Sequence, residues 1–120
     1  MKKSALILSI LLVISNLVIA GQFAEPPKTA EIKIKTSAIC GMCKKRIERD
    51  LGVTKGVVSS ELNVASKIVT ITYNTKKTSP EKIKQVISKI GYDADEVTAD
   101  QKSHDALPDC CQKTSTMHKD

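Results

Sequence analysis

Two alternating runs of residues, joined by a short turn, constrain the fold of this chain most strongly. The runs are GVVSSELNV at residues 56–64 and KIVTITYN at residues 67–74, and they meet at the segment ASK. Because successive side chains of a strand point to opposite faces, each run places its apolar residues on one side. The pattern predicts a β-hairpin whose inward positions are Leu62, Val64, Val69, Ile71 and Tyr73.

The segments before the hairpin predict one strand and one helix. EIKIKTS begins at Glu31 and alternates as a half-buried strand does, with Ile32 and Ile34 facing inward. CKKRIERDLG then predicts a helix, because Ile47 and Leu51 lie four residues apart on one helical face. A strand, a helix and a hairpin therefore follow one another along the chain.

After the hairpin, SPEKIKQVISKIG carries clear signals for a second helix. Ser79 is suited to cap its N-terminus, Pro80 to its first turn and Gly91 to its end. Its apolar stripe comprises Ile83, Val86, Ile87 and Ile90. YDADEV, at residues 92–97, is predicted to be a short final strand. The β-α-β-β-α-β order predicts an α+β, ferredoxin-like fold, in which a four-stranded antiparallel sheet carries two helices on one face.

The beginning of the chain shows a different pattern. Two lysines precede an apolar run that continues to Val18, and Val18 and Ala20 occupy the small-residue positions of a cleavage site. These features predict that residues 1–20 are a secretory signal peptide and that the protein is periplasmic. In the alternative, residues 5–20 remain as a membrane anchor, because the run is close to the roughly 17 to 25 residues that a spanning helix needs.

The rest of the chain divides into three predicted parts. Residues 21–30 contain two prolines and form a linker, residues 31–97 form the domain, and residues 98–120 form a polar C-terminal tail. The chain has a formal net charge of +6, but it has one Phe, two Tyr and no Trp. Aromatic platforms on which bases could stack are therefore missing, and nucleic acid is not an expected partner.

The four cysteines of the chain form two close pairs, of which the first is Cys40 and Cys43. This C-x-x-C spacing occurs in metal sites, in structural disulfides and in redox disulfides. Cys43 is predicted to lie in the first turn of a helix, where backbone N–H groups and the helix dipole favour a thiolate. Thiolates bind soft metals, and two ligands at the edge of a domain suit Cu(I) or Hg(II) better than a structural Zn(II) with four ligands.

Neighbouring residues leave several interpretations open. A disulfide between the two cysteines is the structural alternative. A redox role is less favoured, because Ile39 stands where thioredoxin-type proteins usually have Trp. Met42 could lend a thioether to Cu(I) or be a surface residue. The basic run Lys44, Lys45, Arg46 and Arg49 is either a solvated helix face or a docking surface for an acidic partner.

The second pair, Cys110 and Cys111, lies in the polar tail. Adjacent cysteines do not easily form a disulfide with each other. The options are a second soft-metal site, a bridge to the first pair, or a bridge between chains. Additional candidate ligands are His104, Met117 and His118. If the tail folds back, all four sulfurs would form one site that favours Zn(II) or Cd(II).

Residues 31–97 resemble a heavy-metal-associated domain, the module of copper chaperones, metal-ATPase amino-terminal domains and periplasmic mercury-binding proteins. The resemblance rests on SAICGMC, on the hairpin GVVSSELNVASKIVTITYN and on KIGYDA. It implies that Cys40 and Cys43 hold the metal and that Tyr92 lies beside the metal loop or covers the end of the core. The family usually has Met where this chain has Ala38, which implies a smaller plug under the loop and a looser site.

Together these features predict a non-enzymatic carrier or scavenger of a soft metal ion. We expect it to be monomeric without metal, and to pass the ion by thiolate exchange to a membrane metal transporter or metal-ATPase. The alternative is an exported thiol–disulfide redox protein that uses the C-x-x-C pair.

Overall fold

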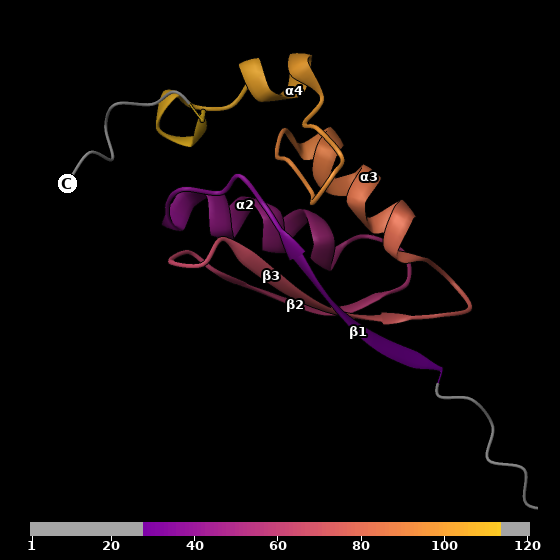
Figure 1. The fold of residues 1–120 in the computed structure, drawn as a ribbon. Coiled ribbons are helices and arrows are strands. Elements are labelled where there is room, and N and C mark those ends of the chain that lie inside the picture. Colours follow the sequence, from indigo (N-terminus) through magenta and orange to yellow (C-terminus); the bar gives the residue numbers. More distant parts are fainter. Residues whose placement is uncertain (1–27, 114–120) are drawn as a thin grey trace, which may run out of the picture.

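The computed structural model describes the strands, helices, burial and contacts of residues 28–113. Three strands form one antiparallel sheet in the order β1-β3-β2. Helices α2 and α3 cover one face of the sheet, and two short helices follow them (Figure 1). The elements are β1 (Thr29–Lys35), α2 (Gly41–Gly52), β2 (Val57–Asn63), β3 (Ile68–Asn74), α3 (Pro80–Ile90), α4 (Gln101–Asp105) and the 3-10 helix η1 (Asp109–Cys111).

The predicted hairpin is confirmed as β2 and β3. Leu62 pairs with Val69 in the antiparallel register, and the pairing shifts between Val57 and Ser59, as at a β-bulge. Four of the five predicted inward positions are buried, whereas Val64, at the turn, is half-buried. The period-2 pattern therefore identified the face of the hairpin that the helices cover.

Both predicted helices are confirmed. The hydroxyl of Ser79 accepts a hydrogen bond from the backbone N–H of Lys82 at the start of α3, and Gly91 ends this helix with a φ of 116°. Ile83 and Ile87 are fully buried in the core, and Val86 and Ile90 pack against it. Helix α2 begins at Gly41, two residues before the predicted start, and buries Cys43, Ile47 and Leu51.

The predicted fourth strand at residues 92–97 is wrong. This segment makes only two isolated bridges, which join Ala94 to Thr36 and to Val97. The backbone N–H groups of Ala94 and Val97 each donate to the carbonyl of the other residue, so the chain turns back on itself. Asp95 has a φ of 51°, and its carboxylate accepts the N–H of Lys35 in place of a strand carbonyl. The backbone turn from Ala94 to Val97 and the contact of Asp95 with Lys35 therefore take the place of a β ladder.

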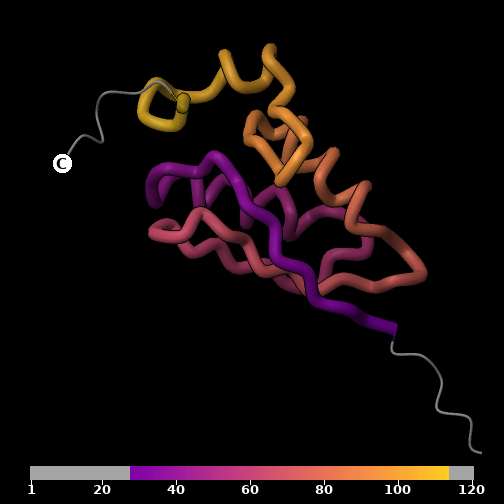
Figure 2. Tube along the Cα trace, in the orientation of Figure 1, coloured from indigo at the N-terminus to yellow at the C-terminus, as the bar shows by residue number. Residues whose placement is uncertain are grey.

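The tail packs on the end of this two-layer core. Helix α4 precedes Leu107, and its N-cap Asp100 accepts the N–H of Ser103. Leu107 and Cys111 are buried and belong to the core cluster. At Gly91 a side chain would meet the backbone oxygen of Ser103 at 3.0 Å, so this glycine allows the close approach of α4. The tail thus returns towards the start of α2 (Figure 2).

An ion pair holds the end of the described tail. Lys113 Nζ lies 2.7 Å from the carboxylate of Asp93, which also accepts the backbone N–H of Ala99. Burial opposes the ionisation of Asp93, but the hydrogen bonds and the charge of Lys113 outweigh it, so the pKa of this carboxyl lies below its ordinary value. Such a group stabilises the fold above its unfolded pKa of about 3.9, and this contribution is lost as the pH falls through the folded pKa.

We therefore expect Asp93→Asn to lower the stability of the protein at about pH 6 and to leave it close to wild type at about pH 2. Urea unfolding across this pH range measures the difference between the two proteins. Asp109→Asn, at an exposed tail position, is the matched control and should give the wild-type profile. A wild-type profile for Asp93→Asn as well would contradict the role given to this ion pair.

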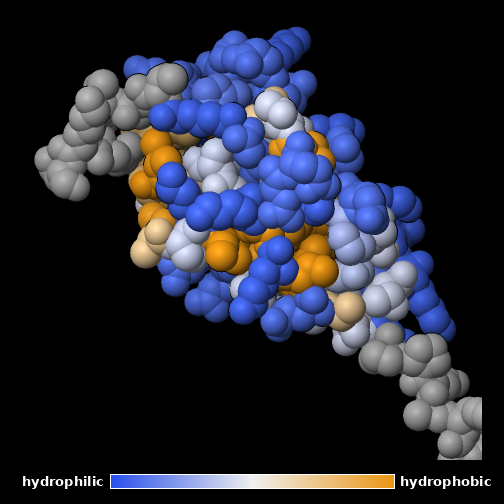
Figure 3. Space-filling view, in the orientation of Figure 1, coloured by the Kyte–Doolittle hydropathy of each residue, from blue (hydrophilic) through white to orange (hydrophobic). Residues whose placement is uncertain are grey.

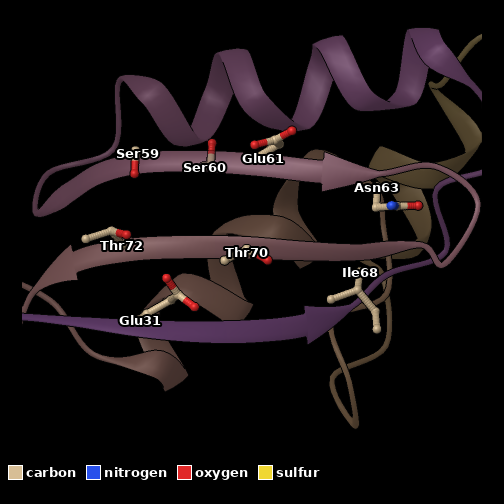
Figure 4. A pocket seen from close by; sticks show the side chains of 8 residues that line it. All are labelled: Glu31, Ser59, Ser60, Glu61, Asn63, Ile68, Thr70 and Thr72. Carbon is tan, nitrogen blue, oxygen red and sulfur yellow. The ribbon is translucent and has the colours of Figure 1, made fainter.

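The other face of the sheet is open and polar. Its side chains alternate with the buried ones along each strand, and eight of them line a pocket of about 460 Å³ (Figure 4). They are Glu31, Ser59, Ser60, Glu61, Asn63, Ile68, Thr70 and Thr72. Its lining contains none of Cys40, Cys43, Cys110, Cys111 and His104, the candidate metal ligands within the described part of the chain.

Several predictions concern residues outside the described part. The signal peptide at residues 1–20, the alternative anchor at residues 5–20, and Met117 and His118 all lie there. Between residues 28 and 113, no helix combines the length and apolar character that a membrane span requires.

Candidate metal centre

The loop between β1 and α2 carries the first pair of cysteines. Cys40 is the N-cap of α2 and has an extended backbone, and its carbonyl accepts the N–H of Lys44 at 3.1 Å. Cys43 lies in the first turn of α2, and its Sγ is 3.3 Å from Sγ of Cys40. This distance is well beyond a disulfide bond of about 2.05 Å, so the two residues are separate thiols here. Both sulfurs are available to one ion.

Burial distinguishes the two thiols. Cys40 is half-buried, whereas the side chain of Cys43 is fully buried and belongs to the core. The expectation of two ligands at the domain edge is therefore wrong for Cys43, because this side of α2 faces the sheet. Ala38 is also fully buried under the loop, in the same core cluster as Leu107 of the tail.

The tail brings the second pair of cysteines to the first. Sγ of Cys40 lies 3.7 Å from the carbonyl oxygen of Cys110, and Sγ of Cys110 lies 3.8 Å from Sδ of Met42. The two tail sulfurs are 3.9 Å apart. The sulfurs of Cys40, Cys110 and Cys111 all lie within 4.8 Å of one another. The path of the tail, which the sequence left open, therefore leads back to the loop.

The buried thiols of Cys43 and Cys111 have opposite pKa shifts. Burial alone would raise the pKa of Cys43, but hydrogen bonds outweigh it and the pKa lies below its ordinary value. These bonds involve the backbone of Ile39 and the side chains of Cys40, Tyr92 and Cys111. Burial, followed by the hydrogen bond with Cys43, raises the pKa of Cys111 to about 12. Of these two buried groups, Cys43 is therefore the favoured thiolate.

Tyr92 lies next to the same two sulfurs. Its hydroxyl is buried and makes no bond of strict hydrogen-bond geometry within the described part of the chain. Burial is the main cause that raises the pKa of Tyr92 far above its ordinary value, and interactions with Cys43 and Cys111 raise it further. The phenol therefore keeps its proton and directs a polar group at the thiols. Both expected roles of Tyr92, in the core and beside the loop, are compatible with this position.

Other candidate ligands differ in their positions. His104 accepts the backbone N–H of Lys113 through Nε2, and its Nδ1 lies 3.6 Å from a carboxylate oxygen of Asp105. It does not belong to the cysteine cluster. Met42 is 54% exposed, as expected for a surface residue, yet its sulfur contacts Cys110. A methionine thioether therefore lies at the rim of the cluster, whereas the histidine does not.

The basic residues of α2 are divided between internal bonds and the surface. Lys44 pairs with Glu48 at 2.9 Å and also donates to the carbonyl of Leu62. Nε of Arg46 is buried and has no partner within residues 28–113. A pocket of about 210 Å³ beside the loop is lined by Met42, Lys45, Arg46 and Arg49. Hydrophobic residues among hydrophilic ones are visible at the loop end of the molecule (Figure 3).

The family model described as heavy-metal-associated domain matches residues 34–93, which are half of the chain and include Cys40 and Cys43. The chain belongs to this family. The match ends before Cys110 and Cys111. The tail cysteines are therefore an addition to the heavy-metal-associated domain.

Relatives of this domain include a copper-exporting P-type ATPase of Staphylococcus saprophyticus, which is 39% identical over 67 residues. The match covers 56% of this chain but only 8% of the ATPase. A CopZ metallochaperone structure is 27% identical, with a TM-score of 0.52 over 54% of this chain and 98% of that chain. The heavy-metal-associated domain thus occurs both as a small chaperone and as a part of large ATPases.

A further structural neighbour is oxidized MerP from Ralstonia metallidurans. It is 18% identical, with a TM-score of 0.53 over 55% of this chain and 93% of that chain. At this identity the likeness concerns the fold alone. The α+β arrangement of the heavy-metal-associated domain is therefore shared, although the described part of this chain has three strands where four were predicted.

Proposed function

We propose that this protein is an exported carrier or scavenger of a soft metal ion, with Cu(I) as its first candidate and Hg(II) as its second. The observation that carries the proposal is the pair of thiols at the start of α2, whose sulfurs lie 3.3 Å apart. One is a buried thiol with a lowered pKa and the other is half-buried. Two soft thiolate ligands so close together are suited to an ion of low coordination number.

The difference in burial suggests an order of ligand exchange. Cys43 is fixed in the core and interacts with Tyr92 and Cys111, so it is the ligand that holds the ion longer. Cys40 is half-buried, so a thiolate of the partner can reach the ion on this side. The bond from the ion to the partner thiolate forms as the bond to Cys40 breaks, and the same exchange then releases Cys43. Neither step is an oxidation or a reduction, because the ion and the sulfurs keep their oxidation states.

Further support comes from the relatives and from the surface. The relative from Staphylococcus saprophyticus is named a copper-exporting P-type ATPase. This name favours Cu(I) as the cargo of the present protein and a membrane metal-ATPase as its partner. The expected signal peptide at residues 1–20 supports action outside the cytoplasm. Lys45 and Arg46 lie beside the loop and would speed the encounter with an acidic partner surface.

Copper transfer tests this proposal. The reduced mature chain, residues 21–120, is loaded with Cu(I) and mixed with the metal-binding domain of a copper-exporting ATPase, and the copper content of both is measured after separation. We expect copper to pass to the acceptor, and to remain behind when the acceptor cysteines are blocked. Disulfide-exchange activity in a chain that holds no stoichiometric Cu(I) would contradict the proposal and favour the redox alternative.

A further inference from the structure

We propose that Cys110 and Cys111 join Cys40 and Cys43 in a single four-sulfur site that holds a tetrahedral divalent ion, Zn(II) or Cd(II). The inference rests on the proposed function, because it assigns a second ion class and two additional ligands to the same site. It goes beyond the family match, which ends before the tail. The observations that carry it are the distances between the sulfurs and the packing that holds the tail in place.

The sulfur positions are close to those that a tetrahedral ion requires. With a metal–sulfur distance of about 2.3 Å, the sulfurs of a tetrahedral Zn(II) site lie about 3.8 Å apart. The sulfurs of the tail pair are 3.9 Å apart and those of the loop pair 3.3 Å. Cys40 lies within 4.8 Å of both tail sulfurs, whereas Cys43 lies 3.3 Å from Cys40 and outside that group of three. Three sulfurs are therefore already close enough to share one ion, and Cys43 joins them when its side chain and the tail sulfurs move closer together.

The tail is held against the loop by contacts that do not involve sulfur. Leu107 is buried in the core, Gly91 leaves room for α4, and Lys113 pairs with Asp93. The side-chain amide of Gln112 also donates to the carbonyl of Leu107. A ligand pair that the fold already holds in position loses less conformational freedom when it binds an ion.

The environment also suits the charge of such a site. Four thiolates and one divalent cation carry a net charge of −2, and any thiol proton that the ion displaces passes to the solvent. Backbone N–H groups at the start of α2 point towards negative charge there. Lys45 and Arg46 lie next to Met42, whose sulfur contacts Cys110. The unpartnered Nε of Arg46 is a further positive group at this rim.

The test compares the reduced mature chain with Cys110→Ser/Cys111→Ser. X-ray absorption at the metal edge counts the sulfurs bound to Zn(II), and competition with chelators measures the affinity. We expect four sulfurs in the wild type and a fall in Zn(II) affinity of about a hundredfold or more in the variant, because Zn(II) prefers four ligands. Cu(I) affinity should change by less than about tenfold, because two thiolates satisfy it. Asp109→Asn, on the same 3-10 helix, is the matched control and should keep four sulfurs.

The outcomes separate the two proposals. Two sulfurs on Zn(II) in the wild type, or equal Zn(II) affinities in wild type and variant, would overturn the four-sulfur site and leave copper carriage untouched. Loss of Cu(I) binding in the tail variant together with loss of Zn(II) binding would overturn the assignment of Cu(I) to the loop pair alone. Far-UV circular dichroism checks that the variant is folded.

Discussion

Replacing Cys40 with serine is expected to abolish high-affinity Cu(I) binding and to leave the fold intact. Cu(I) in the loop depends on two thiolates, and a serine hydroxyl is a poor ligand for a soft ion. Cys40 is the N-cap of α2, makes no side-chain cap bond and is only half-buried. Serine is a favoured N-cap residue, so helix α2 should be retained or slightly stabilised. Chelator competition measures the affinity, and far-UV circular dichroism follows the helix content.

This variant is best measured in two backgrounds. In the full chain Cys110 and Cys111 remain within reach of the ion, whereas in Cys110→Ser/Cys111→Ser only Cys43 is left after Cys40 is replaced. Met42→Leu is the matched control, because it removes an exposed thioether from the first turn of α2 and should keep the wild-type affinity. Wild-type affinity for Cu(I) and Hg(II) after the loss of Cys40, in the background without tail cysteines, would show that the ion binds elsewhere.

Replacing Ile87 with alanine should strongly destabilise the hydrophobic core. Ile87 is fully buried on α3 and belongs to the cluster shared by the sheet and the helices. Removing its buried methyl groups should lower the free energy of unfolding by about 2 to 5 kcal/mol. This is a large share of the roughly 5 to 15 kcal/mol that stabilises a small domain. Urea unfolding of the metal-free, reduced protein measures the loss.

Lys89→Ala provides the comparison on the same helix, because Lys89 is exposed and near the C-terminal end of α3. Its expected effect is within about 0.5 kcal/mol, as for most surface substitutions. A loss below about 0.5 kcal/mol for Ile87→Ala as well would mean that α3 does not bury this face.

Local patterns explain the elements that the sequence predicted correctly. The hairpin follows from alternation, and α3 follows from Ser79, Pro80, Gly91 and an apolar stripe. The final strand was predicted from the same kind of pattern and failed. There the backbone groups of Ala94 and Val97 bond to each other and close a turn instead of a ladder, while the carboxylates of Asp93 and Asp95 accept N–H groups outside that turn. A period-2 pattern over six residues cannot distinguish these two arrangements.

The sequence could predict only the part of the candidate site that depends on local structure, which is the loop pair of cysteines. Cys40 and Cys43 are three positions apart, so their approach follows from the start of one helix. Cys110 lies 70 positions from Cys40, and its approach depends on the packing of the tail. Among residues 98–113 the sequence has one large aliphatic side chain, Leu107, and a helix of five residues has no periodicity to read. Contacts of this kind depend on the whole fold.

The absence of a fourth strand from residues 28–113 has a consequence for self-association. Both outer strands of the sheet are edges, where unpaired backbone groups can pair with another molecule. On β2, the side chains of Lys44 and Glu48 occupy the carbonyl and N–H of Leu62. On β1, Asp95 occupies both backbone groups of Lys35. The exposed Lys33 places charge further along the same edge, so each edge carries its own barrier against strand-to-strand aggregation at high protein concentration.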